Sequence, residues 1–255
     1  MRTVRDLMDL SGRVALVTGG AGHIGGAIAE ALAECGADVV VTNNRWSSSM
    51  AARWWFCPAD LESPDEIRGL VEGVRRGRSG HLDILVNSAA YLDGPGLDVP
   101  FEQQTAADWD RSFAVNLRAP FLLAQACAPM LRASGHGSVI NVASIYGVVG
   151  PDWRLYEGTG MGNAAAYAAS KGGLLQLTRW LATTLAPEVR VNAIVPGGVA
   201  RGQNPAFVAR YCARTPLGRM ATEEDIKGVV AFLASDASAY VTGAAIPVEG
   251  GWTCW

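Results

Sequence analysis

Short apolar segments of strand length alternate along the chain with longer segments whose apolar residues recur every three or four positions. Arg13–Thr18 is strand-like, and Ile24–Cys35 follows it with a helical period. Further strands are expected at 38–42, 82–86, 138–143, 189–195 and 244–248. Strands that are apolar on both faces and alternate with helices predict an α/β fold. We expect a single doubly wound, Rossmann-type domain, with a central parallel sheet flanked by helices on both faces.

Polar residues mark the starts of several helices. Ser63, Pro64 and Glu66 form an N-cap, a proline at the first helical position and a glutamate at the third. Comparable starts at 105–108 and 222–225 predict a helix running to about Ala133 and a last helix near the carboxyl end. Another helix is expected from about Ala165 to Ala186. No linker, low-complexity stretch or internal repeat divides the sequence, so residues 1–255 are expected to form a single domain.

Composition narrows the functional classes. Only 18% of the 255 residues are charged and the net charge is −3, which argues against a nucleic-acid binder because such a protein needs a basic face. No apolar run reaches the roughly 18 residues of a membrane span, and the first residues do not resemble a signal peptide. The five cysteines are scattered and the three histidines form no ligand cluster. A cytoplasmic protein without a metal site is therefore expected.

A glycine-rich turn joins the first strand to the first helix. It reads Thr18-Gly-Gly-Ala-Gly-His-Ile-Gly25. Gly19 permits a sharp turn, Gly22 lets the backbone approach a pyrophosphate, and Gly25 lets the helix pack on the strand. The helix N-terminus then offers free N–H groups to phosphates. Asn87, after the strand at 82–86, and Asp60-Leu61 are weaker signals at the ends of other predicted strands.

Tyr167 and Lys171 lie four positions apart, on one face of a predicted helix. Hydride transfer to a ketone needs a proton donor at the oxygen, and a neighbouring ammonium can lower the pKa of a tyrosine to suit that role. Ser144 follows the preceding strand, where its hydroxyl could bind the substrate oxygen. Asn116 lies in the helix that begins near Thr105, where it could hold a water that links Lys171 to solvent. Each residue alone has an ordinary structural explanation, but their joint appearance in this order favours an enzyme.

Together, the motifs TGGAGHIG, LVNSAA, AVNLRAPF, INVASIYG, YAASK and PGG resemble the compact branch of the short-chain dehydrogenase/reductase family over essentially the whole chain. The resemblance implies that Tyr167 is the acid/base and that Lys171 lowers its pKa and binds the nicotinamide ribose. It also implies that Ser144 positions the substrate carbonyl and that Asn116 supports a proton relay. The candidate cofactor-binding residues are Gly19, Gly22, His23, Ile24, Gly25, Asn43, Arg45, Asp60, Leu61, Asn87, Ala89, Tyr167, Lys171, Pro196, Gly197 and Val199.

The sequence departs from the family pattern at several positions. His23 replaces the middle glycine of the loop, Asn87-Ser-Ala-Ala90 replaces the usual NNAG, and Arg201 replaces a threonine. The Ser144–Tyr167 interval is about ten residues longer than in the family, which defines an insertion at about 148–163. A long loop beside a catalytic site can cover the substrate, and a structural or subunit-contact role is an equal alternative. Candidate substrate residues are Trp153, Arg154 and Tyr156 in the insertion, and Arg201 in a substrate loop at about 200–220. Arg210 and Arg214 in the same loop could, with Arg201, recognise a carboxylate or phosphate, and a solvated surface is the alternative for all three arginines.

The end of the second predicted strand bears on the cofactor. It carries no carboxylate to bind the adenosine ribose diol, and Arg45 could pair with a 2′-phosphate. NADP is therefore favoured over NAD, although Asn43 could hydrogen-bond a ribose hydroxyl.

The expected function is hydride transfer between a nicotinamide cofactor and a carbonyl or alcohol carbon, with a sugar or other polar ketone as the expected substrate class. A 3-ketoacyl-thioester reductase, a sugar dehydratase or epimerase, and a non-catalytic dinucleotide sensor are the alternatives. By resemblance, the leucines after Tyr167 lie on a helix that pairs with a second copy, so a homodimer or homotetramer is expected.

Overall fold

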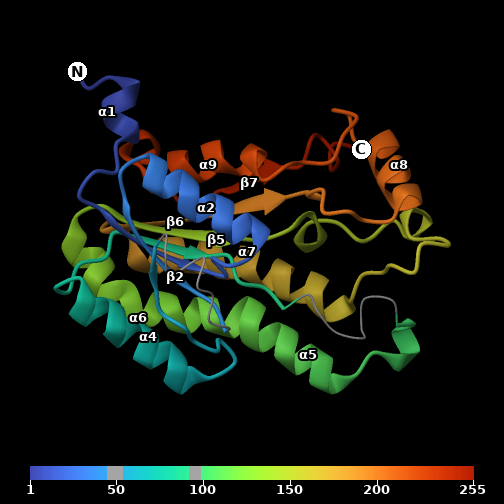
Figure 1. Ribbon diagram of the computed structural model, residues 1–255, viewed down its shortest axis with the longest axis horizontal. Coiled ribbons are helices and arrows are strands. Elements are labelled where there is room, and N and C mark those ends of the chain that lie inside the picture. The colour runs from blue at the N-terminus through green and yellow to red at the C-terminus, as the bar shows by residue number, and fades with distance from the viewer. Residues whose placement is uncertain (45–53, 92–98) are drawn as a thin grey trace.

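A parallel sheet forms the centre of the molecule. A computed structural model describes residues 1–44, 54–91 and 99–255, and in these the sheet has seven strands in the order β3-β2-β1-β4-β5-β6-β7 (Figure 1). The strands are β1 (Val14–Thr18), β2 (Asp38–Thr42), β3 (Trp55–Phe56), β4 (Ile84–Asn87), β5 (Gly137–Val142), β6 (Val189–Pro196) and β7 (Ala245–Val248). The order reverses between β1 and β4. In doubly wound sheets the crevice for a ligand opens beyond the carboxyl ends of the strands at such a point.

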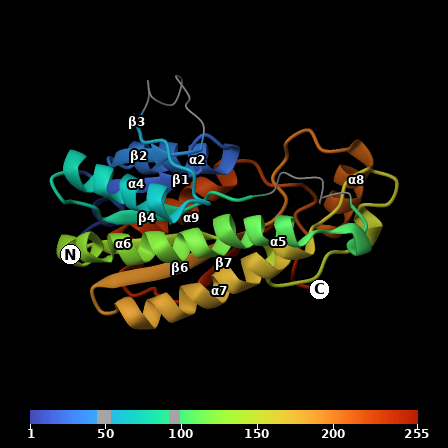
Figure 2. The same cartoon turned by 90° about the horizontal axis from the view of Figure 1, so that it is seen from below.

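Helices cover both faces of the sheet. They are α1 (Val4–Met8), α2 (His23–Glu34), α4 (Pro64–Gly77), α5 (Ala106–Phe113), α6 (Ala119–Ser134), α7 (Ala165–Leu185), α8 (Pro205–Arg214) and α9 (Glu224–Ala234). Helices α2 and α9 pack on one face, whereas α4, α6 and α7 pack on the other (Figures 1 and 2). The predicted doubly wound α/β fold is confirmed.

The strands are buried on both faces because their alternate side chains enter different cores. Leu16 and Leu85 pack with α4, α6 and α7, while Val17 and Val86 pack with α2 and α9. All four side chains are fully buried. This arrangement explains why the strands are continuously apolar instead of alternating between apolar and polar residues.

The helix starts follow the predicted caps. The Ser63 hydroxyl accepts a hydrogen bond from the backbone N–H of Glu66, and the Thr105 hydroxyl accepts one from Asp108. The long helix expected from 105 to about 133 is interrupted, because Ala114–Arg118 forms a π-helical turn between α5 and α6. The expected substrate loop at about 200–220 contains helix α8, which the sequence analysis did not predict.

A third apolar cluster lies near the carboxyl ends of β5 and β6. It joins the insertion to α8 and the carboxyl-terminal segment through Leu155, Phe207 and Trp252. Among residues 1–44, 54–91 and 99–255, none of the helices has the length and hydrophobicity that crossing a membrane requires.

Candidate active site

The glycine-rich turn forms a cradle at the carboxyl end of β1. Gly19 has a φ of +69°, and a Cβ atom there would lie 2.8 Å from Cα of Ala89. A Cβ atom on Gly25 would overlap the carbonyl group of Gly19. The Thr18 hydroxyl joins this turn to the segment after β4, because it accepts 3.0 Å hydrogen bonds from the N–H groups of Ser88 and Ala89. The two segments therefore approach too closely for larger residues.

The N-terminus of α2 faces out of this cradle. Gly22 is the N-cap and provides no side-chain cap, so the first N–H groups of the helix are left for another acceptor. His23 begins the helix, and its Nδ1 lies 3.1 Å from Oε1 of Glu223 at the start of α9. Ile24 packs into the core beside α2. A glycine-rich turn followed by a helix end with free N–H donors fits a pyrophosphate.

The positions predicted to meet the adenosine end lie beside β2 and β3. Asn43 follows β2, and its carbonyl accepts a hydrogen bond from Ala59. A carboxylate oxygen of Asp60 accepts a 2.9 Å hydrogen bond from the N–H of Glu62, and Leu61 is buried in the core. Arg45, the candidate 2′-phosphate partner, lies outside the described residues.

Asn87 ties the end of β4 to the neighbouring strand β5. Its Nδ2 donates a 2.8 Å hydrogen bond to Oδ1 of Asn141, and Nδ2 of Asn141 donates in turn to Oγ1 of Thr178 on α7. All three side chains are buried. Oδ1 of Asn87 is buried without a hydrogen-bond partner in the described part of the chain. An orphaned acceptor beside the cradle fits a bound polar group.

Tyr167 and Lys171 project from the first turns of α7, beside Ser144 at the end of β5. Nζ of Lys171 donates a 2.6 Å hydrogen bond to the carbonyl of Val142 and lies 5.7 Å from the ring centroid of Tyr167. Lys171 is 2% exposed. An ammonium has three N–H donors, so this single bond leaves two that fit hydroxyl groups such as those of a ribose.

The two ionisable groups are shifted in opposite directions. Burial raises the pKa of Tyr167, while a hydrogen bond from Ser144 and the charge of Arg201 lower it by smaller amounts. Burial lowers the pKa of Lys171 to about 8. The expected lowering of the Tyr167 pKa is therefore not achieved by the chain alone, because burial outweighs these contributions.

Asn116 lies in the π-helical turn between α5 and α6. Its Oδ1 accepts a 2.7 Å hydrogen bond from the N–H of Tyr91, and its Nδ2 donates a 3.1 Å bond to Oγ of Ser170, the residue before Lys171. The side chain thus joins the segment after β4 to α7. The sequence analysis identified Asn116 but not the π turn, which breaks the regular helical hydrogen bonding at this residue.

Pro196 and Gly197 continue β6 into the loop before α8. The N–H of Gly198 donates a 2.6 Å hydrogen bond to the hydroxyl of Tyr211. Nε2 of Gln203 donates to the carbonyl of Val199, and Oε1 accepts from the N–H of Arg201. These bonds fix the loop, and Arg201 is exposed and close enough to Tyr167 for its charge to act on that phenol.

The chain is similar in sequence and in fold to several known proteins. A family model described as enoyl-(acyl carrier protein) reductase matches residues 19–253. Cis-4-hydroxycyclohexanecarboxylate dehydrogenase of Sinomonas cyclohexanicum is 34% identical, over 94% of this chain and 96% of that protein. The crystal structure of a short-chain dehydrogenase of Leptospira borgpetersenii with bound NAD⁺ has a TM-score of 0.87 and 32% identity, over 99% of this chain and 96% of that one. A gluconate 5-dehydrogenase of Burkholderia cenocepacia in complex with NADP and tartrate has a TM-score of 0.86 and 30% identity, over 99% and 100%.

The chain belongs to the short-chain dehydrogenase/reductase family. Membership confirms the prediction of an oxidoreductase that uses a nicotinamide cofactor and acts on a carbonyl or alcohol carbon. In the described ranges, no group of three or more His, Cys, Asp or Glu residues is arranged to hold a metal ion.

The insertion of this short-chain dehydrogenase/reductase docks on α8. Nη1 of Arg214 pairs with Asp152 at 2.9 Å, and Nη1 of Arg210 donates a 2.6 Å hydrogen bond to the carbonyl of Glu157. Arg210 and Arg214, which the sequence offered as ligands for an anion, thus hold the insertion in place. Asp152 also pairs with Arg154, which lowers the pKa of that carboxyl to about 2.

The candidate substrate residues separate in the structure. Trp153 and Arg154 are exposed, whereas Tyr156 is buried at the base of the insertion. The hydroxyl of Tyr156 meets that of Tyr146, which sequence reasoning did not single out. Its place two residues after Ser144 was the one signal in the sequence that could have identified Tyr146. The contact with Tyr156 could not be predicted, because only the fold brings the two residues together.

Proposed function

We propose that this enzyme interconverts a small polar alcohol and its ketone, with a hydroxy acid as the substrate class. The observation that carries the catalytic part is the convergence of Tyr167, Lys171 and Ser144 beside the phosphate-binding cradle. When bound, the nicotinamide cofactor supplies or accepts the hydride. Tyr167 Oη gives a proton to the substrate oxygen in reduction and receives it in oxidation. Ser144 orients that oxygen by a hydrogen bond.

Lys171 and Asn116 support the proton transfer. The buried ammonium of Lys171 has two donors left for ribose hydroxyls, and its positive charge favours the phenolate form of Tyr167. Asn116, by holding Tyr91 and Ser170, positions the segment that precedes Lys171. We assign the proton relay to this end of α7.

The cofactor is held by the cradle and by the strand ends next to it. Gly22 lets the backbone approach the pyrophosphate, Gly19 and Gly25 permit the tight packing that shapes the cradle, and His23 stands at its edge. Asn43, Asp60 and Leu61 flank the adenosine, while Ala89, Pro196, Gly197 and Val199 line the nicotinamide side, as the family resemblance implies. NADP remains favoured over NAD because β2 ends without a carboxylate.

Arg201 is the residue that would bind an acid group of the substrate. It is exposed, its charge acts on Tyr167, and its guanidinium forms no ion pair within the described part of the chain. The names of two relatives, a 4-hydroxycyclohexanecarboxylate dehydrogenase and a gluconate 5-dehydrogenase, denote carboxylate substrates. A hydrogen bond to a charged group contributes roughly 1.5–3 kcal/mol. Arg201→Gln should therefore lower kcat/KM for gluconate about 10–100-fold and leave that for sorbitol unchanged.

The test of the function combines turnover with binding. Tyr167→Phe should reduce cofactor-coupled turnover more than about 100-fold, while calorimetric titration shows cofactor affinity nearly unchanged. Titration of the wild type with NADP and with NAD decides the preference. Unchanged turnover in the variant would refute the catalytic assignment, and binding of neither dinucleotide would refute the enzyme itself.

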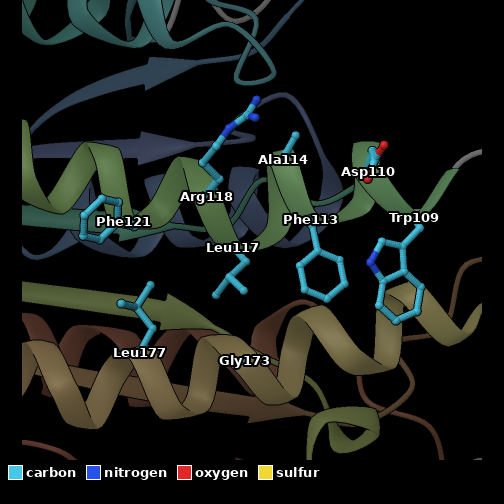
Figure 3. A pocket seen from close by; sticks show the side chains of 9 residues that line it. All are labelled: Trp109, Asp110, Phe113, Ala114, Leu117, Arg118, Phe121, Gly173 and Leu177. Carbon is cyan, nitrogen blue, oxygen red and sulfur yellow. The ribbon is translucent and has the colours of Figure 1, made fainter. Parts of the chain in front are cut away.

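We further propose a homodimer, and by extension a homotetramer, located in the cytoplasm. A groove opens between α5–α6 and α7 (Figure 3). Its lining residues are Trp109, Asp110, Phe113, Ala114, Leu117, Arg118, Phe121, Gly173 and Leu177. Exposed Trp180 extends the apolar surface along α7. A second copy, placed two-fold against this face, would bury it. Light scattering should report a dimer or tetramer for the wild type and a smaller species for Phe121→Asp.

A further inference from the structure

Tyr146 is fixed between two catalytic residues. It lies in the 3-10 turn η3 (Ile145–Gly147), and its N–H donates a 3.2 Å hydrogen bond to Oγ of Ser144. On the other side, Gly147 packs on α7 so closely that a Cβ atom would lie 2.7 Å from the carbonyl carbon of Lys171. The position of the Tyr146 ring is therefore tied to both Ser144 and Lys171.

The insertion brings a second phenol to the first. Tyr156 follows the 3-10 turn η4 (Trp153–Leu155), and its hydroxyl oxygen lies 2.5 Å from that of Tyr146. Tyr156 is only 8% exposed and packs against the ring of Phe207, with 5.2 Å between centroids. The ring of Tyr146 packs edge-on against Trp252. Two hydroxyl groups therefore meet inside a mainly apolar cluster.

Both hydroxyls are donors at neutral pH. Burial raises the pKa of Tyr146 and that of Tyr156, and the neighbouring Tyr167 contributes to both shifts. Two phenols carry two protons, and their mutual hydrogen bond uses one of them. The side chain of Asn163, which is 9% exposed, lies near Tyr156 and lowers the pKa of that phenol by a smaller amount than burial raises it. Burying a polar side chain costs free energy unless the side chain finds hydrogen-bond partners. Three such side chains gathered here therefore indicate a polar partner, such as a bound ligand.

We infer that the Tyr146–Tyr156 pair, supported by Asn163, recognises a substrate hydroxyl on the carbon next to the reacting carbonyl. The substrate class is then an α-hydroxy ketone in reduction and a vicinal diol in oxidation. This inference rests on the proposed function, because it places the reacting oxygen between Ser144 and Tyr167. A hydroxyl can accept the remaining phenol proton and donate to the other phenol oxygen, whereas a methylene group leaves that remaining proton without an acceptor.

The insertion makes this recognition separate from catalysis. Tyr156 belongs to the insertion, which is held on α8. Arg214 binds Asp152, and Arg210 binds the backbone carbonyl of Glu157. The reacting groups, in contrast, belong to β5 and α7. Removing the Tyr156 hydroxyl should therefore change which ketone is preferred and leave the hydride and proton transfer intact.

The experiment compares two ketones that differ only in one hydroxyl, acetoin and butanone, with the full-length enzyme and excess cofactor. We expect the wild type to reduce acetoin with a kcat/KM about 100-fold higher, which corresponds to one or two unsatisfied buried groups. Tyr156→Phe should reduce this preference to below about tenfold through loss of acetoin activity alone. Tyr146→Phe is the second variant, in case Tyr156→Phe does not fold. Tyr240→Phe, at a fully exposed phenol, is the matched control and should keep the wild-type ratio.

An equal loss on both ketones in the variants would indicate a purely structural role and overturn the inference. A wild type without preference, or one that reduces neither ketone, would overturn it as well. The proposed function is decided independently, by cofactor calorimetry and the Tyr167→Phe variant. Failure of hydroxyl recognition is thus distinguishable from failure of the enzyme assignment.

Discussion

Lys171 is a buried ammonium whose folded-state pKa is about 8, compared with 10.5 for the free side chain. Replacing it with methionine, Lys171→Met, keeps the volume and removes the charge. The variant should lose turnover because Tyr167 loses its cationic neighbour. The free energy of unfolding of the variant makes a sharper test. The charge of Lys171 changes that free energy by an amount that depends on pH, and the lowered pKa determines the sign of this dependence.

The sign and magnitude of this pH dependence of stability follow from proton linkage. Between pH 8 and 10.5 the unfolded chain still holds the Lys171 proton, whereas the folded chain has released it, so wild-type stability rises with pH in this window. The charge costs the folded state about 3 kcal/mol at pH 7.5 and about 1 kcal/mol at pH 9.5. The wild type should therefore gain about 2 kcal/mol relative to Lys171→Met between these pH values.

Urea unfolding of both proteins at pH 7.5 and 9.5 measures this difference. The lost hydrogen bond to Val142 is the same at both pH values and cancels, as do the buried tyrosines. Lys227→Met is the control, because Lys227 is paired with Glu30 and Glu34 and its pKa is raised above the usual value. Its difference from the wild type should not change over this interval. A pH-independent difference for Lys171→Met would refute the lowered pKa.

Three other changes test the scaffold of the site. Gly25→Ala places a methyl group against the Gly19 carbonyl, so we expect at least a tenfold loss of dinucleotide affinity by calorimetry and about 1–3 kcal/mol lower stability. Asp83→Ala removes a buried carboxylate that accepts a 2.7 Å hydrogen bond from Val14; urea unfolding should show a loss of about 1–3 kcal/mol, and an unchanged midpoint would contradict this. Arg210→Met releases the backbone of the insertion, so limited proteolysis should cut at 148–163 faster than in the wild type, while equal rates would show that Arg210 does not hold it.

Local signals in the sequence were sufficient for most of the fold. Ser63 and Thr105 cap the helices they were expected to cap, since an N-cap depends only on the next three residues. The strands were recognisable because burial on both faces requires continuous apolar residues. The family motifs then located Ser144, Tyr167 and Lys171, which the fold brings together.

The parts that could not be predicted depend on tertiary contacts. A π turn at Asn116 has the same apolar pattern as a regular helix, so periodicity gave no warning. Arg210 and Arg214 looked like anion ligands because an arginine's partner cannot be identified from sequence. The Tyr146–Tyr156 contact joins residues ten positions apart across two turns. For Arg45, outside the described residues, the phosphate-binding prediction stays a prediction.

Because the insertion is held mainly by α8, the substrate range of this enzyme can change without change in the sheet. Its anchors, Asp152 and the backbone near Glu157, contact α8 and not the sheet. Within the core, in contrast, Asn87, Asn141 and Thr178 form a buried hydrogen-bonded chain, so changing one of them leaves its neighbours without a partner. Directed evolution that randomises 148–163 and the facing side of α8 as one cassette should yield new substrate ranges without loss of folding. The same number of substitutions at Asn87, Asn141 and Thr178 should yield mostly inactive protein.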